Sequence, residues 1–322
     1  MKKHPIGRTG NIAEEKLRRR NFLSGRLLLP VLLLAGLAAP IRGEDPEFPL
    51  IQSLAYFPYS ENVLPKGKTF SLGFTLQYAN VFMFDPKAPV INDFETFSTT
   101  IAGRLALTKG VTLEAYFRFA SIFPGKLDKT IEDFHRLFGL PDNYRLQYPR
   151  NIVQYRFYDS FDYQERKNFR SPAIVSLHVD LYRRPGFSLG SRIGVGIPID
   201  NSAGLGGGKS FFSAGITATY QHRRTQIDAS FYSAWYRKPD WLQPYLTRPA
   251  ILFSEIKACW GSIIAGFRVR SSPFRTGDIA HTGYQISLGC RIGRYFEFLI
   301  LEDLPRFDTT PDIGFSLNVK LI

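Results

Sequence analysis

Three polar side chains lie close together in a segment with the spacing of an amphipathic helix. They are Asp133, His135 and Arg136. A catalytic histidine needs a nucleophile or a metal partner nearby, and the histidines His178, His222 and His281 lie on separate predicted strands or loops. We therefore interpret His135 as a helix residue with a local hydrogen bond, with ligand binding and catalysis as the alternatives.

A second pair of charges shares one face of a predicted strand. Glu114 and Arg118 are four residues apart in Val111–Phe119, opposite an apolar face that includes Phe117. In a barrel, such charges are expected to point into the lumen. The candidate lumen or binding residues are thus Asp133, His135, Arg136, Arg145, Glu114 and Arg118. The sequence predicts no catalytic or metal-binding residue and no cofactor.

Two other patterns carry little chemistry. Residues 204–210 read GLGGGKS, but a phosphate-binding loop needs four residues between its first Gly and the Gly-Lys pair, and residue 203 is Ala. Cys259 and Cys290 lie in separate predicted strands, too far apart in sequence for a typical metal motif. We interpret the glycines as a flexible loop and the cysteines as ordinary buried or lipid-facing residues.

The segment from Val111 to Pro141 combines two kinds of periodicity. Apolar residues first alternate with polar ones, as in a strand. Leu127, Ile131, Phe134 and Phe138 then recur at helical spacing. Asp128 is expected to cap this helix, predicted over 127–139, and Gly139 and Pro141 to end it.

The charge distribution argues against nucleic-acid binding. The formal net charge is +13, but residues 1–43 contribute +7 of it, with nine Lys or Arg and two Glu. The basic residues of the remainder are scattered rather than gathered in a stripe. We expect no nucleic-acid partner.

The amino terminus has the composition of an export signal. A basic region precedes the apolar run 27–41, which is too short for a spanning helix. We predict a signal peptide over 1–43 with the mature chain starting at Glu44, and an N-terminal periplasmic segment over 44–68. The sequence Arg19-Arg20-Asn21-Phe22-Leu23 also resembles a twin-arginine motif, which conflicts with export of an unfolded barrel; both routes stay open.

The remainder, 69–322, repeats a segment of about ten residues with period two. About twelve such segments occur, and long and short connections alternate between them, as in bacterial outer-membrane barrels. A connection over Asp85–Asp93 and a loop over 122–172 are among the long ones. The fold prediction is all-β: an antiparallel transmembrane β-barrel of about 12 strands with one short helix in a long loop. A soluble sandwich is the alternative.

Two smaller features belong to the loops. The stretch Ile152–Phe157 resembles a strand, but an extra strand would break the alternation, so we place it within the long loop, as an extension or one half of a hairpin. The aromatic residues around the 237–249 loop are interpreted as markers of the membrane–water interface. They are Trp235, Tyr236, Trp241 and Tyr245.

One segment resembles a known family. Thr130–Arg145 reads TIEDFHRLFGLPDNYR, which is similar to the signature of domain-of-unknown-function family 3187, exported bacterial proteins. Tyr78-Ala79-Asn80 and Glu95 resemble the family's first hairpin, and Glu302-Asp303 and Pro311-Asp312 its last connection. One departure is the carboxyl terminus, which ends on Leu321-Ile322 rather than on an aromatic residue. The resemblance implies an outer-membrane barrel, not a reaction.

The functional expectation is an outer-membrane channel, transport or binding barrel. The apolar stripe of the helix needs a surface, and its polar side is not rich in Lys and Arg, which favours the barrel mouth over the headgroup layer. We therefore predict that the helix narrows the lumen. The expected partners are outer-membrane lipid, the barrel-insertion machinery and a small solute. The alternatives are a lipid-acting enzyme and a structural barrel without transport.

Overall fold

The protein is described here by a computed structural model. The described residues are 69–85, 89–139, 146, 149–206, 208–246, 248–271, 273, 282–293, 295–303 and 313–321. The predicted signal peptide, the 44–68 segment, Pro141 and Arg145 lie outside these ranges. Within the described ranges, no helix has both the length and the apolar character needed to cross a membrane.

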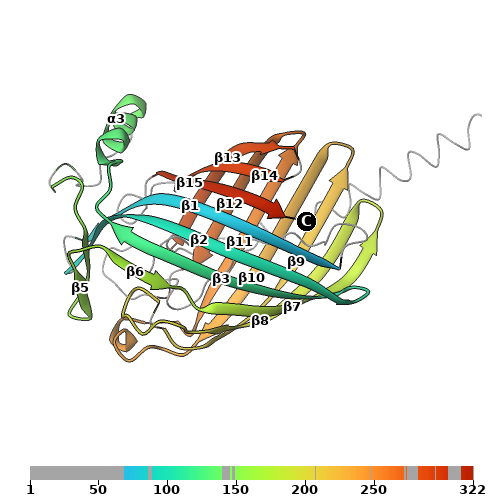
Figure 1. The fold of residues 1–322 in the computed structure, drawn as a ribbon, viewed down its shortest axis with the longest axis horizontal. Coiled ribbons are helices and arrows are strands. Elements are labelled where there is room, and N and C mark those ends of the chain that lie inside the picture. Colours follow the sequence, from blue (N-terminus) through green and yellow to red (C-terminus); the bar gives the residue numbers. More distant parts are fainter. Residues whose placement is uncertain are drawn as a thin grey trace, which may run out of the picture. The chain divides into compact units, whose positions relative to one another are not determined.

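One antiparallel sheet closes on itself to form the barrel (Figure 1). Twelve strands follow one another round the ring, and the pairing of β2 with β3 closes it. The ring strands, in spatial order, are β2 (Val90–Thr108), β1 (Phe70–Asp85), β15 (Ile313–Leu321), β14 (Phe296–Asp303), β13 (Thr282–Ile292), β12 (Ile263–Ser271), β11 (Ala250–Trp260), β10 (Thr225–Tyr236), β9 (Phe211–His222), β8 (Phe187–Ile197), β7 (Ala173–Arg184) and β3 (Val111–Phe123). The predicted fold class is confirmed.

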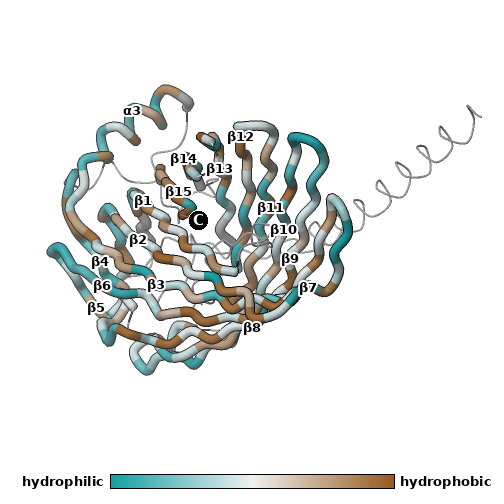
Figure 2. Tube along the Cα trace, turned by 45° about the vertical axis from the view of Figure 1, so that its right-hand side comes forward, coloured by the Kyte–Doolittle hydropathy of each residue, from teal (hydrophilic) through white to brown (hydrophobic). Residues whose placement is uncertain are grey.

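Period-two alternation explains why these segments form a closed sheet. Successive side chains of a strand point to opposite faces, so one face of every strand must line the lumen and the other must face outward. The exposed large apolar side chains of the ring strands all fall on the outward positions, and Figure 2 shows the resulting alternation of hydropathy along the strands. Examples are Phe97, Phe119, Ile193, Phe267 and Ile300. Most charged positions of the ring strands fall on the other face, among them Glu114, Arg118, Arg192, Lys257 and Glu297.

The β1–β2 hairpin is longer than expected. The connection predicted over Asp85–Asp93 is wrong, because β2 begins at Val90 and continues the pairing from Asp85↔Val90 through the whole of β1. The last residues of this hairpin extend past the neighbouring pairings, since β15 reaches only as far as Ala79 on β1. One side of the barrel therefore carries a two-stranded extension beyond β15, Asn80–Asp85 with Val90–Glu95.

The predicted 122–172 loop contains more structure than one helix. It holds α3 (Asp128–Phe138), the hairpin β4 (Gln154–Phe157) and β5 (Phe161–Tyr163), and β6 (Lys167–Arg170). The hairpin predicted at Ile152–Phe157 is present. The strand β6 pairs with β3 just beyond β7, with a register shift of one residue between Phe119↔Arg170 and Tyr116↔Ile174. Pro172 lies at this shift, where proline lacks the N–H that a regular ladder requires.

Candidate functional site

Paired charges fill part of the lumen around β3. The Glu114 carboxylate forms an ion pair with Arg192 and lies 3.3 Å from the Arg104 Nε, and the Ser176 hydroxyl donates to it. The Arg192 guanidinium also donates to the Tyr116 hydroxyl at 2.9 Å. Because all these positions share the inward parity of their strands, the cluster ties β2, β3, β7 and β8 together across the barrel interior.

Arg118 lies on the same inward face, four residues beyond Glu114 toward the long-loop end of β3. It is 1 % exposed, and its Nη2 donates to the Ser98 hydroxyl at 2.7 Å. The structure thus brings Glu114 and Arg118 to the lumen, as the alternation indicated. It does not bring them together with the residues of α3.

A second cluster lies near the short-turn end on the other side of the ring. The Glu297 carboxylate meets three cations: Lys257 at 2.8 Å, Arg291 at 2.7 Å and Lys320 at 3.1 Å. Glu297 is 2 % exposed, so it is buried among them. The surplus of cations over carboxylates here is repeated across the described inward face. Its cations are Arg104, Arg118, Arg192, Lys257, Arg268, Arg270, Arg291 and Lys320, and its carboxylates are Glu114, Asp180, Asp228, Glu255 and Glu297.

At the long-loop end, the β4–β5 hairpin covers the barrel mouth. The strand β4 pairs with the extension of β2, with Asn92↔Tyr155 in register. From there the hairpin reaches loops that lie across the mouth: the Tyr155 hydroxyl donates to the Gly204 carbonyl at 2.6 Å, and the Ser160 hydroxyl to the Trp241 carbonyl at 2.7 Å. The loop containing Trp241 joins β10 and β11, and β11 is halfway round the ring from β2.

Aromatic packing reinforces this cover. The Tyr158 and Tyr245 rings stack at 4.2 Å, and Phe161 packs against Trp241 at 5.8 Å. Tyr155 is completely buried and packs against Phe94 of β2 at 4.9 Å. Since aromatic pairs contribute stabilisation beyond the area that they bury, the hairpin is firmly held against both sides of the mouth.

These contacts correct the interface interpretation of the aromatic loop. Trp235 points outward and is 45 % exposed, as expected of an interface residue. Tyr236 is buried on the inward face, and Trp241 and Tyr245 pack in the mouth. Sequence position alone could not tell which of these aromatic residues face the membrane. The alternation along β10 places Trp235 outward and Tyr236 inward, and tertiary packing places Trp241 and Tyr245 in the mouth.

The helix α3 does not enter the mouth, so the predicted plug is wrong. Its first turn binds β1 and β2 through outward-facing positions: the Asn80 amide donates to the Asp128 carboxylate at 3.0 Å, and the Leu127 N–H donates to Glu95 at 2.6 Å. Asn80 and Glu95 are register partners on the face opposite the lumen. The two hydrogen bonds hold the start of the helix on the outward side of the β1–β2 extension, and Ile131 of the apolar stripe is fully buried.

The start of the helix also differs from the prediction. Leu127 occupies the N-cap, and Asp128 makes no side-chain cap; its carboxylate binds Asn80 and the Asn151 N–H instead. The prediction of a Gly139 stop is confirmed, since Gly139 has φ 66° and its N–H donates to the His135 carbonyl. A left-handed residue at this position favours glycine.

The remaining helix candidates separate into buried and exposed residues. His135 is 7 % exposed, whereas the side chains of Asp133 and Arg136 are 52 % and 72 % exposed and form an ion pair at 3.1 Å. Neither the charged pair nor His135 faces the lumen cluster, since α3 is bound to the outward side of β1 and β2.

Two residues of this site escaped prediction. Gly125 lies against Glu95 so closely that a Cβ there would come within 1.6 Å of the Glu95 side chain, which explains why the chain needs glycine where it crosses β2. Arg150 binds the buried Glu132 through Nε at 2.8 Å, and this pairing raises the pKa of Arg150 above its ordinary value. The sequence does show Gly125 as a glycine just before the predicted helix. Nothing in the sequence indicates that Arg150 pairs with Glu132.

The described residues offer no metal centre, since none of them form a group of three or more His, Cys, Asp or Glu suited to hold a metal ion. Cys259 is buried on the inward face and Cys290 half-buried on the outward face, both as free thiols. The exposed ion pair of Asp133 and Arg136 lies on α3, at the long-loop end of the barrel. His178 and Asp180 lie 3.3 Å apart on the inward face near the short-turn end.

The amino-acid sequence matches the model of a known protein family. Residues 49–183 match the family model described as Protein of unknown function (DUF3187). The predicted resemblance to this family is confirmed. No curated protein matches the sequence. In the part of the chain that matches this family, Tyr78, Asn80 and Glu95 meet the start of α3 at Leu127 and Asp128, just before the helix signature.

Solved structures with a similar fold include three membrane proteins. An outer membrane channel from Pseudomonas putida F1 is 12 % identical with a TM-score of 0.49, over 82 % of this chain and 97 % of that one. The transport unit of the autotransporter AIDA-I from Escherichia coli is 7 % identical with a TM-score of 0.43, over 85 % and 96 %. OmpF from Salmonella typhi, in complex with daunomycin, is 8 % identical with a TM-score of 0.33, over 81 % and 99 %.

The geometry by itself defines the class of barrel. An outward face rich in exposed apolar side chains, an inward face of buried charges, and tight turns at one end with long connections at the other make this an outer-membrane-type β-barrel.

Proposed function

We propose that the protein is a channel of the bacterial outer membrane that admits small anionic solutes and is closed by the β4–β5 hairpin. The observation that carries this proposal is the charge of the inward face, where cations outnumber carboxylates on the described strands. Once water enters the pore, a wall on which cations outnumber carboxylates would raise the local concentration of anions and select for them.

The closing element follows from the mouth contacts. The hairpin is anchored on β2 and held across the opening by side chains. They include the hydroxyl bonds of Tyr155, Ser160 and Tyr163 and the ring contacts of Tyr158 and Phe161. No ring strand has to separate for the hairpin to move. An outward swing about its junction with β2 would open the mouth while leaving the closed sheet intact.

Conductance in planar bilayers tests the closing element. One variant replaces residues 154–163 with a Gly-Ser linker of equal length, and its control deletes residues 126–139 of the helix. We expect the hairpin variant to conduct in frequent, large steps and the helix variant to behave as the wild type does. Equal conductance of all three proteins, or opening by the helix deletion alone, would overturn the proposal.

The reversal potential under a salt gradient tests the selectivity. The hairpin variant should prefer chloride over potassium, and a second variant carrying Arg104→Gln and Arg268→Gln should lose part of that preference. A preference for potassium in the hairpin variant would refute the anionic substrate class, even if the pore itself is confirmed.

A further inference from the structure

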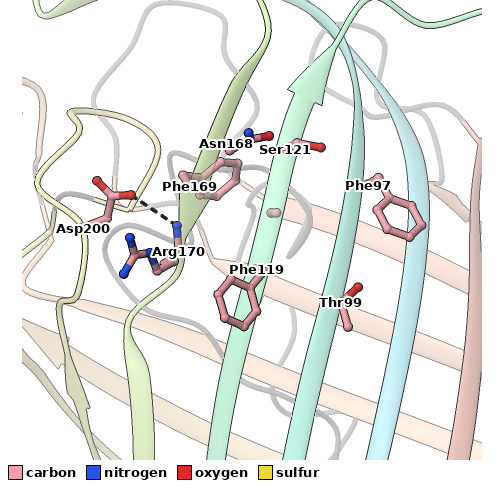
Figure 3. Close-up of a pocket in the computed structure, with 9 residues that line it drawn as sticks. Phe97, Thr99, Phe119, Ser121, Asn168, Phe169, Arg170 and Asp200 are labelled. Carbon is pink, nitrogen blue, oxygen red and sulfur yellow. Dashed lines mark hydrogen bonds between the residues drawn. The ribbon is translucent and has the colours of Figure 1, made fainter.

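A groove crosses the outward wall of the barrel beneath the long-loop rim. It has a volume of about 360 Å³ and runs from β2 over β3 and β6 to the loop after β8 (Figure 3). The lining residues are Phe97, Thr99, Phe119, Ala120, Ser121, Asn168, Phe169, Arg170 and Asp200. None of these belongs to the lumen clusters or to the seat of α3.

Two prolines account for the groove. The pairing of β7 with β8 ends at Ala173↔Ile197, and the next residues on each side are Pro172 and Pro198. Because neither proline has an N–H, the main-chain hydrogen bonds between these two segments stop there. The strand β6, which precedes Pro172, therefore separates from the loop that follows Pro198. The Asp200 carboxylate takes the place of a ladder acceptor, receiving the Arg170 N–H at 3.3 Å.

The outward side chains of β3 and β6 change in character along the groove. Phe119, which is 46 % exposed, is the register partner of Arg170 across β3 and β6. One step further toward the rim, the outward pair is Ser121 with Asn168. On β3 and β6 the outward positions therefore change from apolar to polar toward the rim, whereas Phe97 of β2 continues the apolar surface at the level of Ser121. The exposed Arg170 lies beside Phe119 at this change.

An arginine on the outward wall is costly in hydrocarbon but favourable at the depth of lipid phosphates. Its planar fork matches a phosphate group, and the phenyl rings of Phe119 beside it and of Phe97 on β2 offer a surface for acyl chains. The Asp200 carboxylate also faces the groove, but both its oxygens accept hydrogen bonds, from the Arg170 N–H and from Ser202. The cation at the groove edge is therefore the group left for an anionic headgroup.

We infer that this groove binds a phosphorylated, acylated glycolipid of the outer leaflet, lipopolysaccharide, with its phosphate on Arg170 and an acyl chain along Phe97 and Phe119. The leaflet follows from the end of the barrel, because long connections of outer-membrane barrels face the outside. This inference rests on the proposed outer-membrane location and is independent of solute transport.

Native mass spectrometry of the purified full barrel in detergent tests the site. Lipopolysaccharide without O-antigen is titrated against wild type, Arg170→Gln and the control Arg166→Gln, whose exposed side chain lies outside the groove. We expect one tightly held copy on wild type and on Arg166→Gln, and about ten-fold weaker binding to Arg170→Gln. A Phe119→Ser variant should weaken binding as well, since it removes the acyl-chain surface.

Three outcomes would overturn the site. They are equal binding by wild type and Arg170→Gln, binding of phosphatidylethanolamine as tight as that of lipopolysaccharide, and a mass showing a second copy of the chain in place of lipid. Each variant's gel mobility before and after boiling shows whether it is folded. Fractionation of cells tests the membrane location separately, so a failure there is distinguishable from a failure of the groove.

Discussion

The Asn80 amide donates to the Asp128 carboxylate at 3.0 Å and joins the first strand of the barrel to the only α-helix of the described residues. Both side chains are buried, at 1 % and 4 % exposure. The second oxygen of Asp128 accepts the Asn151 N–H, so the same carboxylate fixes the chain before and after the helix. This small polar contact determines which side of the wall carries the helix.

Replacing Asn80 should therefore release the helix without unfolding the barrel. In Asn80→Leu, the buried Asp128 carboxylate loses a donor, at a cost of about 1–3 kcal/mol to the docking of α3. Limited trypsin digestion should cleave at Lys126 and Lys129 faster than in wild type, while the heat-dependent gel shift stays unchanged. The control Asp133→Asn alters an exposed residue and should leave cleavage as it is; faster cleavage there would contradict the assigned contact.

The two faces of β3 should respond oppositely to charge. Phe117→Arg places a cation on the outward wall, and should destabilise the inserted barrel by about 2–4 kcal/mol near the bilayer midplane. Arg118→Leu removes an inward charge and should still permit insertion. Urea unfolding in lipid vesicles measures both. Similar losses in the two variants would mean that the faces are reversed.

Removing Glu297 should destabilise the barrel from within. Glu297→Gln leaves Lys257, Arg291 and Lys320 close together without their shared carboxylate. Breaking a buried pair in this way costs about 3–5 kcal/mol. The same urea measurement should show the loss, and Glu165→Gln, at a carboxylate whose side chain is 74 % exposed, should show almost none.

The loop after β8 should loosen in acid. Burial raises the pKa of Asp200, but hydrogen bonds from Ser202 and from the Arg170 N–H outweigh it and hold the pKa below its ordinary value. A lowered pKa stabilises the folded loop above the unfolded value of about 3.9, and this stabilisation is lost as the pH falls through the folded pKa. Hydrogen exchange at the Arg170 and Ser202 amides should accelerate in that range, and Asp200→Asn should abolish the change.

The sequence predicted the barrel because alternation is a property of each strand separately. The outward and inward positions of Phe117 and Arg118 follow from one strand alone. The seat of α3 depends on the length of the β1–β2 hairpin, which no turn signal near Asp85 indicated. An amphipathic helix shows that it needs an apolar surface, but not which one, and Asn80 lies 48 residues from Asp128. The same holds for the mouth, where Tyr155 of β4 contacts the loop after β8, four strands further along the chain.

The two-stranded extension of β1 and β2 carries α3 on its outward face and the β4–β5 hairpin on its edge, pointing over the mouth. Glu95 holds the helix segment, and its neighbour Phe94 contacts Tyr155 on the lumen side. The outward seat of the helix and the cover of the mouth are thus connected through adjacent residues of a single strand. A molecule that binds α3 and displaces it would therefore also displace the β1–β2 extension. The β4–β5 hairpin, which pairs with that extension, would move away from or toward the mouth with it.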